Sequence, residues 1–231
     1  PRSTLFPYTT LFRSMQQSAE QDAASLGFGV EELLEEGLTW MLLRLRIRPE
    51  TSAWPVGRQE LTVETWPSAC DARFAFREFT FGTGEGPFAH VWSDWLMVDT
   101  ESGRPVRLED RFAARHLDPR GMRPLEPFPR LKQEGDPLLT MEFPVRLSDL
   151  DVNGHVNNSH YVHWIREAVP DGLRFSGMIR SLDLEYRAGA RYGDTVCVAC
   201  HDAGEGQFDH FLQSRDGGVL YVRARSRWTG A

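Results

Sequence analysis

Four polar residues that can transfer protons or form strong hydrogen bonds occur at every second position in the segment SDLDVNGHVNNSHYVHWI, residues 148–165. They are Asp149, Asp151, Asn153 and His155. In an extended backbone, alternate side chains point to the same side. The spacing therefore predicts that Asp151, Asn153 and His155 share one side of a loop.

These residue types can together hydrolyse an acyl compound without a nucleophilic side chain. The carboxylate of Asp151 can orient a water molecule or act as a base. The amide of Asn153 can donate to a substrate carbonyl or an oxyanion, and His155 can relay protons near neutral pH. A helix is predicted to begin at Asn157 or Asn158, and its first free N–H groups would bind anions or carbonyl oxygens.

A second interpretation of the same residues is helix capping. Asp and Asn are good N-cap residues, and Gly154 with the pair of asparagines suits a turn. Capping requires only one or two such residues, whereas this segment alternates Asp, Asn and His. The pattern favours an active site, with capping as the alternative.

The elements before this segment are predicted from periodicity and from Gly, Pro and Asp boundaries. Residues 16–26 favour a helix that ends at Gly27, and residues 30–36 favour a short second helix. From Leu43 onward, apolar residues and arginines alternate as in a half-buried strand. An antiparallel meander is completed by strands predicted over residues 58–67, 71–81 and 88–99.

The second half repeats this organisation after a linker. Residues 116–137 contain five prolines and no periodicity, so they are predicted to connect two domains. A strand over residues 138–148, a helix over residues 157–169 that ends at Pro170, and four more strands follow. The apolar face predicted for this helix comprises Tyr161, Trp164, Ile165 and Ala168. Both halves thus have a helix and about four strands, which indicates a duplication with a period of about 110–120 residues. The predicted fold class is α+β, with each sheet covered by a helix.

The composition is that of a folded protein and argues against several functional classes. The 231 residues are 41% hydrophobic and 26% charged, and the net charge is -7. An acidic chain argues against nucleic acid as the main partner. No apolar run approaches the roughly 20 residues of a membrane span, and we also expect no signal peptide.

The three cysteines, Cys70, Cys197 and Cys200, are few and odd in number. Reduced thiols in a cytoplasmic protein explain them most simply. Cys197 and Cys200 have the spacing of a CxxC motif, but positions three apart in a strand face opposite ways. We therefore expect no metal site, no redox site and no cofactor.

The first residues look foreign to the rest of the chain. The segment TLFPYTTLFRS, residues 4–14, resembles the translation of a common sequencing adapter. We interpret residues 1–14 as an artefact of that kind; the alternative is a genuine but unusual N-terminus. The predicted domains are then residues 15–115, lacking a first element, and residues 138–231, which carry the polar loop.

The segment SDLDVNGHVNNSHYVHWIREAVP closely resembles the helix-entry motif of the fatty acyl-ACP thioesterases, plant and bacterial enzymes with the hotdog fold. In the first half, DAASLG, ETWP and VWSDWLMVDTESGRPVRL also resemble that family. The resemblance implies two fused hotdog domains, each a curved antiparallel sheet wrapped around a central helix. It also implies hydrolysis of thioesters on the phosphopantetheine arm of acyl carrier protein, with Asp151, Asn153 and His155 at the catalytic positions.

One departure from the family pattern concerns the strand after the second helix. Family members carry a further acidic residue there, followed in plants by a cysteine, and this chain has Gly189 and Ala190 instead. A substitution Gly189→Glu is therefore expected to raise activity or leave it unchanged. Glu185 is a candidate auxiliary acid that partly replaces the missing group; the alternative is a solvated strand residue, because charged side chains mostly face water.

Two rows of arginines could form a basic surface for acyl carrier protein, which is acidic. The alternative is two solvated strand faces. The rows are predicted to share strand faces and comprise Arg44, Arg46, Arg48, Arg223, Arg225 and Arg227.

The leading functional hypothesis is an acyl-ACP thioesterase of fatty acid biosynthesis. A hotdog thioesterase that acts on acyl-CoA is a close rival, although the two-domain length favours the carrier protein. A non-catalytic acyl-thioester binding module is a rival of another class, and Gly189 in place of an acid is its main support. The sequence leaves open the chain length of the acyl group and whether the protein forms a homodimer.

Overall fold

The computed structural model describes residues 8–51, 60–108, 117–118, 127–151 and 153–229. The chain divides into two compact units, one of them Arg13–Pro127 and the other Phe128–Ala231 together with Pro1–Phe12. The division after Pro127 falls inside the linker predicted over residues 116–137. The described residues of that linker form no helix or strand. The limits of the two domains and the foreign origin of residues 1–14 stay predictions.

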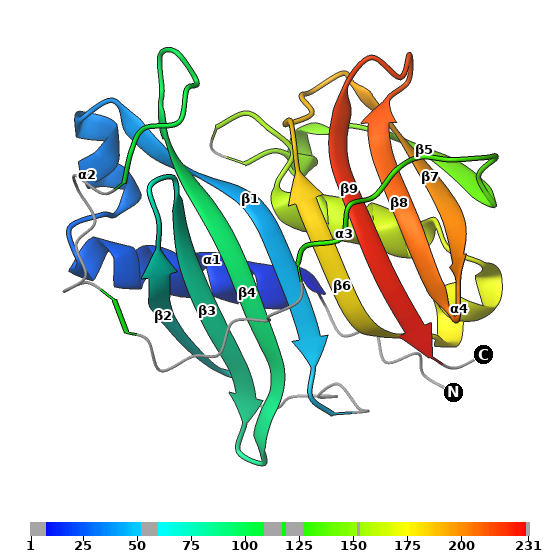
Figure 1. The fold of residues 1–231 in the computed structure, drawn as a ribbon, viewed down its shortest axis with the longest axis horizontal. Coiled ribbons are helices and arrows are strands. Elements are labelled where there is room, and N and C mark those ends of the chain that lie inside the picture. Colours follow the sequence, from blue (N-terminus) through cyan, green and yellow to red (C-terminus); the bar gives the residue numbers. More distant parts are fainter. Residues whose placement is uncertain (1–7, 52–59, 109–116, 119–126, 152, 230–231) are drawn as a thin grey trace. The chain divides into compact units, whose positions relative to one another are not determined.

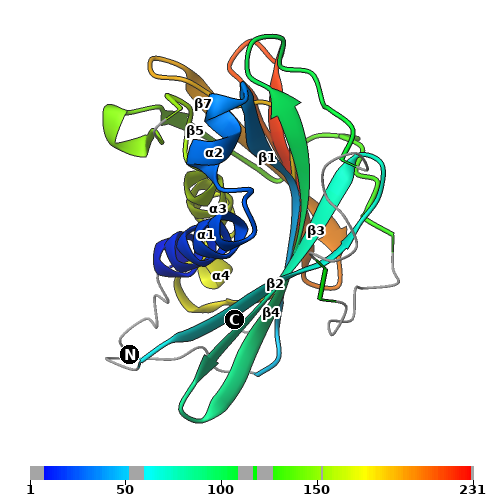
Figure 2. The same ribbon diagram turned by 90° about the vertical axis from the view of Figure 1, so that its left-hand side faces the viewer.

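The N-terminal unit is an antiparallel sheet with a long helix on one face (Figure 1). Figure 2 shows α1 along the concave side of this sheet. The strand order is β2-β3-β4-β1. Its elements are α1 (Tyr8–Ser25), which belongs to this unit from Arg13 onward, α2 (Val30–Glu35), β1 (Leu38–Pro49), β2 (Thr62–Cys70), β3 (Phe74–Thr83) and β4 (Gly86–Asp99).

The alternation predicted for the first strand is confirmed beyond a bulge. The pairing of β1 with β4 shifts between Leu42 and Arg44, so the regular alternation begins after Leu43. Leu45 and Ile47 are then fully buried. Beyond the bulge, the apolar residues of this strand form the core, and its arginines lie on the opposite face of the sheet.

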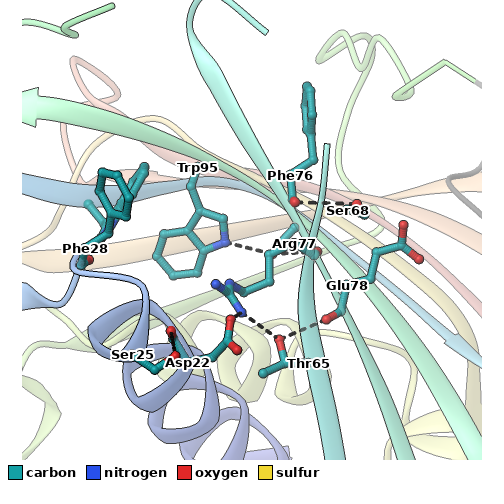
Figure 3. Close-up of polar contacts among 11 residues, drawn as sticks. Asp22, Ser25, Phe28, Thr65, Ser68, Phe76, Arg77, Glu78 and Trp95 are labelled. Carbon is teal, nitrogen blue, oxygen red and sulfur yellow. Dashed lines mark hydrogen bonds and ion pairs between the residues drawn. The ribbon is translucent and has the colours of Figure 1, made fainter. Parts of the chain in front are cut away.

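An ion pair between a buried arginine and a half-buried aspartate links α1 to the sheet in this unit (Figure 3). The guanidinium of Arg77 donates to the carboxylate of Asp22 over 2.6 Å and to the hydroxyl of Thr65 over 3.2 Å. Burial lowers the pKa of Arg77, and the neighbouring carboxylate of Asp22 opposes that shift. Because removing one partner leaves a buried charge without compensation, this pair fixes the position of α1 against β2 and β3.

The C-terminal unit has a five-stranded antiparallel sheet in the order β6-β9-β8-β7-β5 (Figure 1). The helix α3 lies across one face of it, and the side chains predicted as its apolar face, among them Tyr161 and Ile165, are buried. The elements are β5 (Leu139–Pro144), the 3-10 turn η2 (Leu147–Asp149), α3 (Asn158–Glu167), α4 (Asp171–Ser176), β6 (Met178–Tyr186), β7 (Thr195–Gly204), β8 (Gln207–Ser214) and β9 (Leu220–Thr229).

The short helix α4 is absent from the sequence prediction. Pro170 was expected to end the preceding helix, and it does follow the C-cap region of α3, but it is also the N-cap of α4. Proline is well tolerated at the start of a helix because it needs no hydrogen bond from its nitrogen there. Among the described residues, none of the helices is long and apolar enough to cross a membrane.

The same local hydrogen bond in both units supports the predicted duplication. The last strand of each unit contains Ser-x-Trp, and the indole N–H of Trp95 donates to the hydroxyl of Ser93 over 2.7 Å. Trp228 donates in the same way to Ser226 over 2.8 Å. Ser226 also contacts the buried imidazole of His210, whose pKa is lowered by burial to about 3, so this histidine is neutral near pH 7.

The arginine rows are less solvated than either sequence interpretation supposed. Arg46 is 8% exposed. Arg223 donates to the carboxylate of Glu185 over 2.5 Å, and Arg225 forms two hydrogen bonds of 2.6 and 2.7 Å with the carboxylate of Asp209. The positive charges of these two residues are therefore neutralised within the sheet surface, which weakens the rows as docking surfaces.

Candidate active site

The polar segment forms a tight turn just before α3 instead of the extended loop expected from the sequence. The N–H of Asp151 donates to the carbonyl oxygen of His155 over 2.7 Å, and the N–H of Gly154 donates to the carbonyl oxygen of Asp151 over 3.1 Å. Gly154 has φ of 72°, which favours glycine. The turn holds Asp151, Asn153 and His155 within five residues.

The carboxylate of Asp151 organises this turn from within. Its Oδ1 atom accepts hydrogen bonds from the N–H groups of Asn153, over 2.8 Å, and of His155, over 3.2 Å. Among the described residues, no donor is assigned to its Oδ2 atom. Asp151 therefore stabilises the turn and does not cap the helix, whose N-cap is Asn157. The second oxygen of Asp151 can bind a water molecule. Asn153 is exposed, and Asp151 and His155 are half-buried.

The turn is anchored to the N-terminus of α3. The predicted helix start is confirmed, because Asn157 is the N-cap and its side chain accepts from the N–H of Ser159 over 3.0 Å. The N–H of Asn157 donates to the carbonyl oxygen of Asp149 over 2.8 Å. The start of α3 therefore lies next to the turn. Asn157 accepts from the N–H groups of Ser159 and His160, and among the described residues no acceptor is assigned to the N–H of Asn158.

A second segment, which follows β6, closes against the turn. The N–H of Val156 donates to the carbonyl oxygen of Ala190 over 2.8 Å. The N–H of Ala190 in turn donates to the hydroxyl of Tyr161 on α3 over 2.9 Å. These bonds place residues 188–190 directly beside the turn. Burial raises the pKa of Tyr161 well above its usual value, so its hydroxyl stays protonated.

Tyr161 holds the segment at Ala190 against α3. The sequence alone had placed it only in the apolar face of the helix. Its side chain is 1% exposed. A buried tyrosine usually finds a hydrogen-bond partner for its hydroxyl group. The presence of a tyrosine among the apolar positions of α3 was therefore a signal, although its partner at Ala190 could not be named from the sequence.

Gly189 packs against the imidazole of His155. A Cβ atom built on Gly189 would lie 2.8 Å from Cδ2 and 2.9 Å from Cγ of His155. Real Cβ atoms essentially never approach that closely, so any other residue at position 189 must displace the ring. The absence of a side chain here is a steric requirement for the present position of His155, which revises the expectation that Gly189→Glu is harmless.

Glu185 lies on the opposite face of the sheet from the turn. The next residue, Tyr186, donates to the carbonyl oxygen of Asn158 in α3 over 3.3 Å, so Tyr186 faces the helix. Successive residues of a strand face opposite sides. Glu185 instead accepts from Arg223 and from Arg187, and it is 2% exposed. The structure does not bring it together with the turn, and it is also not the solvated residue of the alternative interpretation.

The cysteines are poorly suited to act as nucleophiles. Cys200 is fully buried, and burial raises its pKa to about 12. The pKa of Cys197 is also raised, mainly by burial and further by its contact with Glu142. The reactive thiolate is therefore disfavoured at both positions. The two residues face opposite sides of β7, as expected from their spacing.

We expect a variant with Cys70, Cys197 and Cys200 replaced by Ser or Ala to keep most of its thioesterase activity. The physical reason is that water, not sulfur, is the expected nucleophile. Initial rates of free acid release, with circular dichroism as the control for lost packing at Cys200, check this expectation. Mass spectrometric trapping of an acyl group on any of the three sulfurs would contradict it.

Comparisons with known proteins identify one family along most of the chain. Residues 6–116 match the acyl-ACP thioesterase N-terminal domain, and residues 133–230 match the acyl-ACP thioesterase C-terminal domain. The chain is 27% identical to a chloroplastic acyl-[acyl-carrier-protein] hydrolase of Cuphea viscosissima over 87% of its length. It is 26% identical to a chloroplastic palmitoyl-acyl carrier protein thioesterase of Gossypium hirsutum over 95% of its length. It spans 52% and 58% of these two relatives.

Solved structures agree with these matches. An acyl-ACP thioesterase from Bacteroides thetaiotaomicron is 25% identical, with a TM-score of 0.85 over 98% of this chain and 91% of that chain. The 12:0-ACP thioesterase from Umbellularia californica is 24% identical, with a TM-score of 0.83 over 96% of this chain and 89% of that chain, and supports the fold. The predicted α+β fold with two hotdog domains is thereby confirmed. The chain belongs to the acyl-ACP thioesterase family.

Proposed function

We propose that this protein hydrolyses the thioester that joins a fatty acyl group to the phosphopantetheine arm of acyl carrier protein. The products are the free fatty acid and the carrier protein with a free thiol. The observation that carries the proposal is the turn of Asp151, Asn153 and His155 at the N-terminus of α3. Family membership supplies the class of substrate.

Each group of the turn has a role that suits its geometry. Asp151 orients a water molecule through Oδ2, because its Oδ1 atom is already held by two backbone N–H groups. The exposed amide of Asn153 and the N–H of Asn158 at the start of α3 stabilise the carbonyl oxygen as negative charge develops on it. His155, in the same turn, accepts a proton from the water and returns one to the departing thiolate.

The proposed reaction balances without a cofactor. The water oxygen forms a bond to the acyl carbon, the carbon–sulfur bond breaks, and the thiolate leaves with one proton from water. The second proton of the water stays with the acid or passes to solvent. No step uses Glu185, which lies on the other face of β6, and no acyl group is attached to a cysteine.

The rival functions differ in what they predict for turnover. An acyl-CoA thioesterase would accept the same thioester without a carrier protein. A binding module would hold the thioester without cleaving it, and Gly189, where the family carries an acid, is the feature that favours it. A reducing, cytoplasmic location is also part of our proposal, and the low and odd number of cysteines supports it. We also propose a homodimer, which sedimentation of the purified protein tests.

We expect the full chain to release free acid faster from acyl-ACP than from the matching acyl-CoA. The reason is that a carrier protein offers a docking surface in addition to the phosphopantetheine arm, which the two substrates share. Paired assays over a series of acyl chain lengths, scored for free acid and free thiol, test this. Equal or faster release from acyl-CoA would contradict the carrier assignment, and binding without release from either would favour the binding module.

A further inference from the structure

Two exposed segments flank the candidate active-site turn in the C-terminal unit. The first begins after β5, where the N–H of Val145 donates to the carbonyl oxygen of Asp194 in the second segment over 2.8 Å. The first segment then continues through η2 into the turn, and Asn157 donates back to Asp149. The second segment runs from the Gly189 contact with His155 to Asp194. These contacts therefore connect the two segments to each other and to the turn.

Each segment exposes one large apolar side chain. Leu147 in η2 is 69% exposed, and Tyr192 in the loop between β6 and β7 is 63% exposed. Placing a large apolar side chain in water is unfavourable unless a partner covers it. Two such residues at the edges of one site indicate a contact surface more strongly than single scattered residues do.

Each of these apolar residues is preceded by an exposed arginine. Arg146 precedes Leu147, and Arg191 precedes Tyr192. Among the described residues, no carboxylate lies within ion-pair distance of either guanidinium group, in contrast to Arg223 and Arg225.

The nearby acids face inward. The carboxylate of Asp149 accepts from the N–H of Arg146 over 2.8 Å and lies 3.6 Å from the imidazole of His160. The carboxylate of Asp194 accepts from the N–H of Arg191 over 2.8 Å and from the hydroxyl of Tyr221 over 3.2 Å. The outward-facing charge of this surface is therefore positive, although the whole chain carries a net charge of -7.

We infer that this surface docks an acidic carrier protein beside the turn. The surface is called the flanking patch, and its members are Arg146, Leu147, Arg191 and Tyr192. The two arginines attract the acidic partner and orient it, because local charge complementarity steers association even when net charges have the same sign. The two apolar side chains pack against the surface of the carrier protein once it has bound. This inference rests on the proposed function, because it names where the carrier of that reaction binds.

The test is a charge reversal with matched controls in the full chain. The variant Arg146→Glu/Arg191→Glu reverses the patch without touching the turn. Arg227→Glu is the control for charge and at the same time tests the arginine row of β9 as a rival docking surface. Arg227 is exposed and lies six residues beyond Tyr221, which contacts Asp194, so it is about 20 Å away along an extended strand. Phe175→Ser is the control for Leu147→Ser, because Phe175 is also 69% exposed but lies on α4, beyond the other end of α3.

We expect the charge reversal to raise KM for acyl-ACP by about tenfold or more with kcat little changed, since charges at the edge of an interface act mainly on association. Hydrolysis of a small acyl-phosphopantetheine substrate should be unaffected. We expect KM of the parent for acyl-ACP to rise with salt concentration, and this rise should be weaker in the charge-reversal variant. Leu147→Ser should also raise KM for acyl-ACP, and both control variants should behave like the parent.

Direct binding separates this inference from the proposed function. Calorimetry with holo carrier protein, whose phosphopantetheine carries no acyl group, measures docking without turnover. Weaker binding by the charge reversal and unchanged binding by Arg227→Glu support the flanking patch even if the parent proves inactive. If the parent hydrolyses acyl-ACP and the charge reversal has unchanged KM and binding, the patch is wrong while the function stands. A parent that neither binds nor cleaves overturns both.

Discussion

Replacement of Asp151, Asn153 or His155 by alanine is expected to lower the rate of acyl-ACP hydrolysis by roughly a hundredfold or more, which is the scale of losing an acid–base group or an oxyanion donor. The loss should appear in kcat, because these groups act on the reacting atoms and not on the carrier protein. Steady-state kinetics with one acyl-ACP substrate measures it for each variant.

The three substitutions should differ in their effect on the fold, which gives an internal control. Asn153 is exposed, and only the N–H of its backbone bonds to Asp151, so Asn153→Ala should leave thermal unfolding unchanged. Asp151→Ala removes the acceptor for two N–H groups and should destabilise the turn by about 1–2 kcal/mol. The conservative variant Asp151→Asn keeps one acceptor oxygen and should restore stability without activity. Rates within about threefold of the parent for all three alanine variants would show that this turn is not the active site.

Substitution of Gly189 is expected to lower activity by about tenfold to a hundredfold, because a small misplacement of a reacting group is costly. A Cβ atom at this position would overlap the ring of His155 and push it away from the turn. We expect Gly189→Ala and Gly189→Glu both to show the loss in kcat. The measurement is the same steady-state assay on acyl-ACP.

The neighbouring residue supplies the control for this prediction. Ala188 is also exposed and already carries a Cβ atom, so Ala188→Ser changes a side chain next to position 189 without placing a new Cβ atom against His155. It should behave like the parent. Activity of Gly189→Glu equal to or above that of the parent would show that an acid is accepted there, as the sequence alone suggested, and that the ring of His155 has room to move.

Elements with a strong local signal could be predicted from the sequence. The start of α3 follows from a capping asparagine before a run with one apolar face, and Asn157 is the N-cap. Strands such as β1 follow from alternation, since Leu45 and Ile47 on one face are buried. The duplication follows from the repeated order of elements, and the two Ser-x-Trp hydrogen bonds give it a structural counterpart.

Contacts between distant segments could not be predicted, for identifiable physical reasons. Apolar and acidic residues alternate from Leu182 to Tyr186 in β6, yet all five are buried, so the sequence could not show that Glu185 is shielded from water and paired with Arg223. The turn at Asp151 depends on backbone hydrogen bonds that residue types alone do not specify. The approach of Gly189 to His155 depends on how the segment after β6 returns to α3. A glycine has no side chain from which this contact could be inferred.

The central claim is that the turn at the N-terminus of α3 cleaves an acyl thioester by direct attack of water. The measurement that tests it most directly is a single turnover of acyl-ACP with the full chain in excess, followed for free acid, carrier thiol and the mass of the protein. The account predicts that acid and thiol appear together at one rate and that the mass of the protein does not change. Thiol released ahead of acid together with an acylated protein, or no release of either, would contradict it.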